Sequence, residues 1–418
     1  MHSSPAVSLT PFATLIPAAM PTDPVEGLYV HVPFCFHKCH YCDFYSITRQ
    51  TPERMDRFVD LVLFEAEQWT SVRPPDSLRP RTIFFGGGTP SLLPLDSMRR
   101  LLVGLRERFD LSRVEEWTIE VNPATANEDY CRMLREQGVD RLSFGAQSFK
   151  PEELAALERH HDPQDVPRSV ELARRAGFAR LNVDLIYAVP GQDLESWSYS
   201  LERAIALGTE HLSCYGLTYE PNTPMGVKKR MGAIQSVDES VELDMLHHTR
   251  RRLIDLGMPP YEISNYSRAA EECRHNLVYW TGGNYLGLGP SAASHLSGWR
   301  WRNRPHLGEW EQAVAAGTLP GIDIEHLTPL QRAGELAMLM LRLSRGINFA
   351  DFSAHTGRSA TDLFADPIDR LTRLGMIRLD SDAIRLTNVG LNVADSISAE
   401  FLDPSAESQI LCPSSRSI

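Results

Sequence analysis

The feature of this sequence that most limits its possible folds is a regular alternation of short β-rich runs with longer helical segments, beginning at Leu28. The runs are rich in Val, Ile, Leu, Phe and Thr, which favour strands. Strands that alternate with helices indicate a parallel sheet, because each parallel pair needs a long crossover connection. The expected strands are Leu28–Val32, Thr82–Phe85, Thr118–Val121, Arg141–Phe144, Leu181–Tyr187 and His211–Leu217.

The segments between these runs carry apolar residues at helical spacing. Gly138 and Gly177 directly follow two of them, as is typical of the left-handed residue that ends a helix. Six such repeats predict an α/β fold, a partial (β/α)6 barrel of TIM type, with its functional residues at the carboxyl ends of the strands. The expected helices are Glu53–Gln68, Leu95–Phe109, Asn127–Gln137, Val166–Arg175 and Leu194–Leu207.

The pattern changes after the barrel. A segment rich in Gly, aromatic residues and Arg comes first, and two helices at Leu330–Leu343 and Asp366–Leu374 follow it. A hairpin at Met376–Leu386 completes an order that is typical of a winged-helix unit. The expected divisions are a disordered tail (residues 1–26), the barrel (27–260), a connection (261–325), a small helical, winged-helix-like C-terminal domain (326–402) and a loose tail (403–418).

Charge and cysteine content restrict the partners and the compartment. The formal net charge of -12 argues against general binding to nucleic acid. The first 37 residues contain no Lys or Arg, and no segment is apolar enough to span a bilayer, although peripheral membrane contact is compatible with the sequence. Seven cysteines, three of them clustered, indicate a metal site in a reducing compartment rather than a disulfide framework. We therefore expect a cytoplasmic protein.

The strongest chemical signal is the run Cys35-Phe-His-Lys-Cys39-His-Tyr-Cys42, which lies just after the first expected strand. Three thiolates on one loop can hold three irons of a [4Fe–4S] cluster and leave the fourth iron open to a ligand. A zinc site is the alternative. It would need a fourth ligand, which His37 or His40 could supply.

In its setting, Tyr29-Val-His-Val-Pro-Phe-Cys35 with Cys42-Asp-Phe-Tyr behind it, this loop resembles the radical SAM superfamily, in particular its oxygen-independent coproporphyrinogen III oxidase-like branch. The resemblance covers roughly residues 27–400. It implies a radical SAM barrel whose open iron binds S-adenosyl-L-methionine (SAM) and, once reduced, cleaves it to a 5′-deoxyadenosyl radical and methionine. A flavodoxin or ferredoxin-type reductant is implied as a partner.

Two further sequence features fit a SAM site. Three glycines in Phe85-Gly86-Gly87-Gly88-Thr89-Pro90 end the second expected strand and let the backbone approach a ligand closely. Asp184 lies inside the apolar fifth strand, where a carboxylate is costly unless it binds a ligand or neighbouring amides. The resemblance places SAM on Tyr29, Tyr41, Gly87, Gly88, Thr89, Glu120, Gln147, Arg159 and Asp184. We expect Arg159 in a helix, and the residues from Gly87 to Asp184 in this set around one cavity facing the cluster.

Two departures separate the chain from the oxidases of this branch. The oxidases carry a fourth cysteine two residues beyond the third, where this chain has Phe44. The run His275-Asn276-Leu277-Val278-Tyr279-Trp280 matches the HNxxYW signature of the HemW family of heme chaperones. The resemblance therefore implies a protein that binds heme and passes it to apo-hemoproteins, with heme as a further cofactor. Oxidative decarboxylation of coproporphyrinogen III is the alternative, and DNA binding through the acidic winged-helix-like domain is the weakest one.

The expected heme residues have their own chemical logic. His275 can ligate iron, and the rings of Tyr279 and Trp280 can pack on a flat macrocycle, although a structural histidine explains His275 as well. Cys273 is the second candidate ligand. The heme and SAM residues do not overlap, so we expect separate sites. In Trp299–Arg304, aromatic and basic residues alternate, and the arginines could pair with heme propionates or belong to an ordinary solvated strand.

Overall fold

The computed structural model describes residues 22–403, so most of the N-terminal tail and nearly all of the C-terminal tail lie outside the described residues. The chain forms two compact units. The first comprises Met1–Tyr279 and Gly283–His326, and the second comprises Trp280–Gly282 and Leu327–Ile418.

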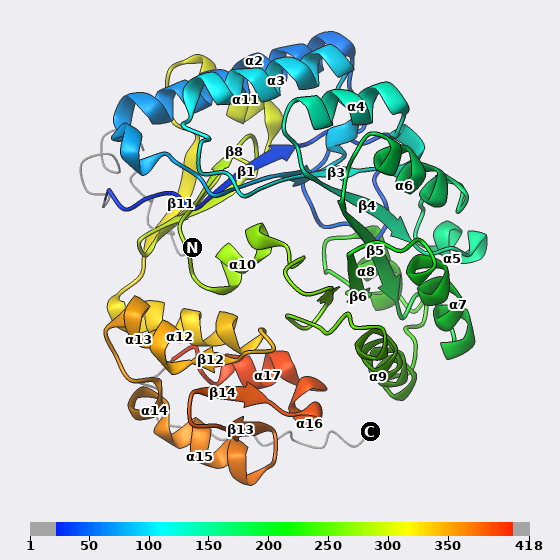
Figure 1. The fold of residues 1–418 in the computed structure, drawn as a ribbon, viewed down its shortest axis with the longest axis vertical. Coiled ribbons are helices and arrows are strands. Elements are labelled where there is room, and N and C mark those ends of the chain that lie inside the picture. Colours follow the sequence, from blue (N-terminus) through cyan, green and yellow to red (C-terminus); the bar gives the residue numbers. More distant parts are fainter. Residues whose placement is uncertain (1–21, 404–418) are drawn as a thin grey trace, which may run out of the picture. The chain divides into compact units, whose positions relative to one another are not determined.

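The first unit is built on a curved sheet in which six consecutive parallel strands lie side by side in chain order. Each coincides with an expected run, and alternate residues of the strands point to the concave face. The α/β fold of partial-barrel type is therefore confirmed (Figure 1). The strands are β1 (Gly27–Val32), β2 (Thr82–Gly87), β3 (Glu116–Val121), β4 (Arg141–Gln147), β5 (Arg180–Tyr187) and β6 (His211–Gly216).

Helices cover the convex face of this sheet (Figure 1). They bury their apolar sides against the strands, as α2 does with Phe58, Val62 and Trp69. Gly138 and Gly177 have φ of 78° and 89°, so their expected left-handed conformation at helix ends is confirmed. The helices are α2 (Pro52–Val72), α3 (Leu95–Arg108), α4 (Glu128–Glu136), α5 (Pro151–Ala156), α6 (Asp165–Arg175), α7 (Leu194–Ile205), α8 (Pro224–Arg230) and α9 (Glu239–Asp255).

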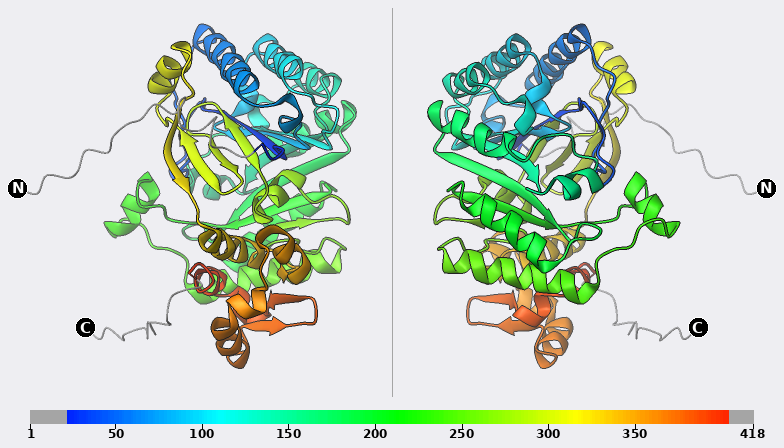
Figure 2. Two further views of the ribbon diagram at one scale, coloured as in Figure 1. Left: turned by 90° about the vertical axis from the view of Figure 1, so that its left-hand side faces the viewer. Right: turned by 90° about the vertical axis from the view of Figure 1, so that its right-hand side faces the viewer.

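The sheet continues beyond the barrel at both edges, to eleven strands in all. On one side β7 (Asn265–Ser267) pairs antiparallel with β6. On the other side β8 (Tyr285–Leu288) runs parallel to β1 (Figure 2). Three antiparallel strands extend that side, and two helices belong to the same region. These elements are β9 (Ala293–Leu296), β10 (Trp299–Asn303), β11 (Gly321–His326), α10 (Arg274–Trp280) and α11 (Leu307–Ala315).

The second unit has its own core, which includes Phe352, Phe364 and Phe401. Its three-stranded sheet has the order β12-β14-β13, so the expected hairpin is present as β13 and β14. Helices followed by such a hairpin form a winged-helix-like unit. The elements are α12 (Pro329–Leu341), β12 (Ile347–Asn348), α13 (Phe349–Thr356), α14 (Ala360–Leu363), α15 (Ala365–Arg373), β13 (Ile377–Leu379), β14 (Ala383–Leu386), α16 (Asn388–Leu391) and α17 (Ala394–Ala399).

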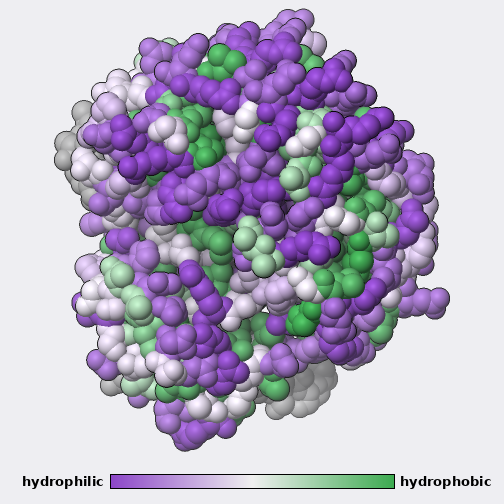
Figure 3. Space-filling view, in the orientation of Figure 1, coloured by the Kyte–Doolittle hydropathy of each residue, from purple (hydrophilic) through white to green (hydrophobic). Residues whose placement is uncertain are grey.

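The described residues include no helix that is both long and apolar enough to cross a bilayer. Hydrophilic residues cover most of the face in Figure 3.

Candidate cluster and cofactor site

The cysteine loop follows β1 directly and is held against the glycine run that ends β2. The backbone N–H of Gly88 donates to the carbonyl of Val32 at 2.8 Å, and that of Thr89 donates to the carbonyl of Phe34 at 2.7 Å. A Cβ atom at Gly88 would lie only 2.7 Å from both of these carbonyl oxygens. Glycine at this position therefore allows the two loops to pack together at the carboxyl ends of neighbouring strands.

The three loop cysteines line one cavity of about 110 Å³. All three are free thiols, and Cys39 is buried. Burial raises the pKa of Cys42 to about 11. The guanidinium of Arg159 lies 3.8 Å from the Cys39 sulfur, and the Thr89 hydroxyl lies 3.7 Å from the Cys35 sulfur. Three soft sulfur donors beside a fixed cation fit an anionic iron–sulfur cluster, because the cation offsets the charge of the thiolates.

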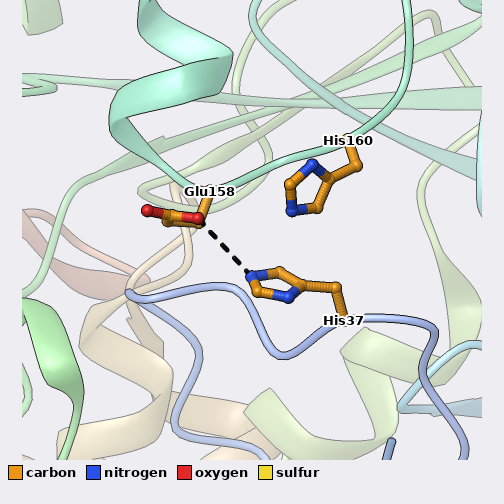
Figure 4. Close-up of side chains that lie close together, drawn as sticks. All are labelled: His37, Glu158 and His160. Carbon is orange, nitrogen blue, oxygen red and sulfur yellow. Dashed lines mark ion pairs between the residues drawn. The ribbon is translucent and has the colours of Figure 1, made fainter.

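Two histidines and a glutamate meet at the rim of this cavity (Figure 4). His37 Nε2 lies 3.7 Å from the Glu158 carboxylate, and the rings of His37 and His160 meet edge to face with centroids 4.4 Å apart. His40 Nδ1 lies 3.6 Å from the same carboxylate. Both histidines that could complete a zinc site at the cysteines thus pair with Glu158 in this structure.

A larger cavity of about 470 Å³ lies on the concave face of the sheet. That volume falls within the range of small-molecule and cofactor pockets. Gly87 lines both cavities, which places them next to each other. The strands contribute to the larger one Tyr29 and His31 from β1, Phe84 and Gly87 from β2, Glu120 from β3, Arg141 and Ser143 from β4, Asn182 and Asp184 from β5, and Ser213 and Tyr215 from β6.

The expected SAM residues from Gly87 to Asp184 are distributed over the two adjoining cavities, which share Gly87. Gly88, Thr89 and Arg159 line the smaller cavity, as does Tyr41, while Tyr29, Glu120 and Asp184 line the larger one. Gln147 is absent from both linings and ends β4 with φ of 67°.

The expected helical position of Arg159 is wrong. Helix α5 ends at Ala156, and Glu158 takes a left-handed φ of 55°, which turns the chain away from the helix axis. Arg159 therefore lies in the loop after α5, and its guanidinium also donates to the carbonyl of Gly145 at 2.8 Å.

The two carboxylates of the larger cavity differ in their surroundings. Asp184 accepts hydrogen bonds from the Ser143 hydroxyl of β4 at 2.8 Å and from the Asn182 amide of its own strand β5 at 2.9 Å, and both stabilise it. Burial, together with the negative charge of Asp184, raises the pKa of Glu120 to about 8. A cationic group in this cavity would favour the ionised form of Glu120.

Helix α10 carries the HNxxYW segment and supplies His275, Asn276 and Tyr279 to the larger cavity. Both ring nitrogens of His275 have partners: Nδ1 lies 2.8 Å from the Thr82 hydroxyl, and Nε2 lies 2.8 Å from the Tyr279 hydroxyl. The ring stacks on Phe84 with centroids 5.3 Å apart. Burial lowers the pKa of His275 to about 4, so the imidazole is neutral at physiological pH.

Other expected heme residues lie elsewhere. Trp280 is not among the residues that line this cavity, and its ring lies under Arg342, 5.1 Å away in the second unit. The Cys273 thiol is buried and donates to Glu116 at 3.3 Å.

The arginines of β10 pair across the sheet with carboxylates of β11. Arg300 bonds to Glu325 at 2.5 Å, and Arg302 bonds to Asp323 at 2.6 Å. Trp301 stacks on Trp69 from the opposite face of β10, so the expected alternation of aromatic and basic faces is confirmed. These pairs favour the ordinary-strand interpretation over a role with propionates.

Comparison with known proteins identifies the family. The model of the radical SAM superfamily matches residues 29–204, and that of the HemN C-terminal domain matches residues 327–393. Heme chaperone HemW of Bacillus subtilis (strain 168) is 31% identical over 379 residues, which are 90% of this chain and 99% of that protein. The chain belongs to the HemW family.

Other HemW proteins match over similar lengths. Heme chaperone HemW of Mycobacterium tuberculosis (strain ATCC 25618 / H37Rv) is 34% identical over 89% of this chain and 97% of its own length. That of Escherichia coli (strain K12) is 32% identical over 91% and 98%. Membership of the radical SAM superfamily implies a [4Fe–4S] cluster and SAM.

The structure of coproporphyrinogen III oxidase (HemN) from Escherichia coli superimposes with a TM-score of 0.79 over 92% of both chains, at 24% identity. This likeness confirms the fold.

Proposed function

We propose that this chain is a heme chaperone that binds heme in the cavity of the barrel and passes it to apo-hemoproteins. The observation that carries the proposal is the position of α10. In a member of the HemW family, this helix places His275 and Tyr279 of the HNxxYW segment on the wall of a cofactor-sized cavity.

The cluster belongs to the adjoining cavity, and SAM would extend from there into the larger one, because its expected residues line both. Cys35, Cys39 and Cys42 would hold the cluster, and the backbone of Gly87 and Gly88 would receive the methionine part of SAM. When bound and reduced, the cluster supplies the electron that cleaves SAM. Arg159 adds positive charge beside Cys39. A flavodoxin or ferredoxin-type protein is the proposed source of the electron.

His275 is the proposed iron ligand, acting through Nε2. Its neutral imidazole is the form that coordinates metals. The contact of Nδ1 with the Thr82 hydroxyl fixes the ring, as hydrogen bonds commonly do for metal-bound histidine. Since the Tyr279 hydroxyl occupies Nε2 in this structure, iron would have to displace it.

Heme titration followed by absorbance tests this assignment. His275→Ala should weaken heme binding roughly tenfold or more, because the iron would lose the imidazole proposed to hold it. Tyr279→Phe keeps the ring but leaves Nε2 free, so it should tighten heme binding by roughly two- to tenfold, the value of one net hydrogen bond. The iron content of the reconstituted cluster should stay the same in both variants. Unchanged heme affinity in His275→Ala would remove His275 as the ligand.

No described feature favours the oxidase over the chaperone. Phe44 occupies the position of the oxidases' fourth cysteine, is 65% exposed and lines the larger cavity. A phenyl ring there adds an apolar surface on which a macrocycle could pack.

A further inference from the structure

Arg141 is a buried cation that faces the larger cavity without a partner. It lies at the amino end of β4, is only 2% exposed and lines the cavity. Among residues 22–403, no group forms a hydrogen bond or ion pair with its guanidinium. A guanidinium carries five N–H donors. Those of Arg141 have no acceptor among the described residues and remain available to an anion in the cavity.

Arg180, the neighbour of Arg141 in the β4–β5 register, shows how this barrel treats a structural arginine. Its guanidinium pairs with Glu116 at 2.9 Å, Asp140 at 3.2 Å and Glu271 at 2.8 Å. Three carboxylates thus form ion pairs with Arg180, whereas none among the described residues forms one with Arg141.

Glu116 is the acidic residue with the strongest electrostatic effect on Arg141, but its oxygens are already engaged. One accepts from the backbone N–H of His275 at 3.0 Å, and the other from the N–H of Arg274 at 3.0 Å as well as from Arg180. The remaining polar neighbours of Arg141 on the cavity wall include Ser143 and Asn182, which are neutral. Glu116 therefore acts on Arg141 through its charge, while no carboxylate among the described residues forms a hydrogen bond or ion pair with the Arg141 guanidinium.

We propose that Arg141 binds a carboxylate of the ligand in this cavity, namely a propionate of heme or of a related tetrapyrrole. This inference rests on the proposed heme-binding function. A guanidinium matches a carboxylate with two parallel hydrogen bonds. The methionine carboxylate of SAM is the other source of this chemistry. However, the register puts Gly145, opposite Asp184, four residues along β4 from Arg141. The carboxyl ends of the strands, where the glycine run would receive the methionine part of SAM, are therefore about 13 Å away along the strand. Glu120 of the expected SAM set lies nearer, opposite Ser143.

The first test uses the unmodified protein. Heme and heme dimethyl ester, whose propionates carry no charge, are titrated in the same detergent. Heme should bind roughly tenfold more tightly or better, because only it can form a charged pair with Arg141. Equal affinities would overturn the inference but leave heme binding intact. Binding of neither compound would instead overturn the proposed function.

The second test uses variants of the two neighbouring arginines. Arg141→Gln should weaken heme binding roughly tenfold while leaving the affinity for the ester unchanged, and Arg141→Lys should recover part of the loss. Arg180→Gln, the matched control, should lower the urea midpoint and keep the preference for heme over its ester. Arg141→Gln should lower the urea midpoint less than Arg180→Gln does, because Arg141 acts on Glu116 through its charge alone, without a hydrogen bond or ion pair among the described residues.

Two results would contradict the inference in these variants. One is an Arg141→Gln protein that retains the wild-type preference for heme over the ester. The other is a loss of SAM affinity with heme affinity unchanged, which would assign the carboxylate to SAM. If Arg141→Gln does not fold, the comparison of heme with its ester on the unmodified protein tests whether a charged propionate contributes to binding.

Discussion

Glu116 is the single residue that organises the amino end of the barrel. It is fully buried, pairs with Arg180 and accepts the first backbone N–H groups of α10. Helix α10 has only seven residues and is too short to be stable by itself. We infer that Glu116 fixes the helix that carries His275.

Glu116 makes a pH-dependent contribution to stability. Burial alone would raise its pKa, but Arg141 and Arg180 hold the pKa below the usual 4.5. A carboxyl whose pKa is lower in the folded state stabilises the protein above its unfolded pKa, and this contribution is lost as the pH falls through the folded value. In the metal-free protein, Glu116→Gln should lower the free energy of unfolding at pH 7 by about 3 kcal/mol and flatten its decline below about pH 4.5.

Urea denaturation between pH 7 and pH 3 measures this effect. Glu115→Gln is the matched control, because Glu115 is half exposed, pairs with Arg81 and should contribute less than about 1 kcal/mol. Wild-type stability at pH 7 in Glu116→Gln, or an unchanged acid slope, would contradict the assigned role.

At the scale of elements, the extension β8–β11 is joined to the barrel through Glu65 of α2. This buried carboxyl accepts from the N–H of Gly289 at 2.9 Å, from the Asn303 amide at 2.7 Å and from the Trp310 indole at 3.0 Å. Burial raises its pKa to about 8, and the three donors oppose that shift. One side chain thus connects α2 with β10, α11 and the loop after β8.

Removing this carboxyl should loosen the whole extension. Glu65→Ala leaves the Gly289 N–H and the Trp310 indole without an acceptor, each at a cost of about 1–3 kcal/mol, so we expect a loss of about 2 kcal/mol or more in the free energy of unfolding. The Asn303 amide keeps backbone carbonyls as acceptors. Hydrogen exchange should accelerate in β8–β10. Glu67→Ala, two residues along α2 at an exposed position, should cost less than about 1 kcal/mol. A Glu65→Ala protein as stable as this control would show that the extension is held by packing alone.

The sequence predicted those helices and strands whose positions follow from the pattern of nearby residues. The six barrel strands, five of their helices and the C-terminal hairpin follow from periodicity and turn residues, whereas α5, α8 and α9 were not predicted. Most of the extension was missed because its strands are short, and because β8 pairs with β1, which lies more than 250 residues earlier. Pairing over such a distance has little local signal.

The site, too, has features that local sequence patterns predict and features that they do not. Motif spacing predicted the cysteine loop and the glycine run, but the separation of the expected SAM residues into two cavities depends on depth along the strands. The importance of Arg141 could have been recognised from the sequence. This residue begins the apolar run Arg141–Phe144 and is as costly to bury there as Asp184 is in its own strand.

At the scale of the whole molecule, the two cavities follow from the barrel itself. The carboxyl ends of β1 and β2 present the cysteine loop, while the concave face below holds the larger cavity. The sequence predicted separate heme and SAM sites, yet Glu120 and Asp184 line the same cavity as His275. If heme and SAM bind as proposed, they would therefore be neighbours.

The central claim is that this chain carries heme and does not convert porphyrinogens. It is tested most directly by anaerobic reconstitution with iron and sulfide, followed by two assays on one sample with SAM and a low-potential reductant: heme titration and conversion of coproporphyrinogen III. We predict about four irons per chain, stoichiometric heme binding and no protoporphyrinogen. Turnover of coproporphyrinogen at the rate of SAM cleavage, or failure to bind heme, would contradict the account.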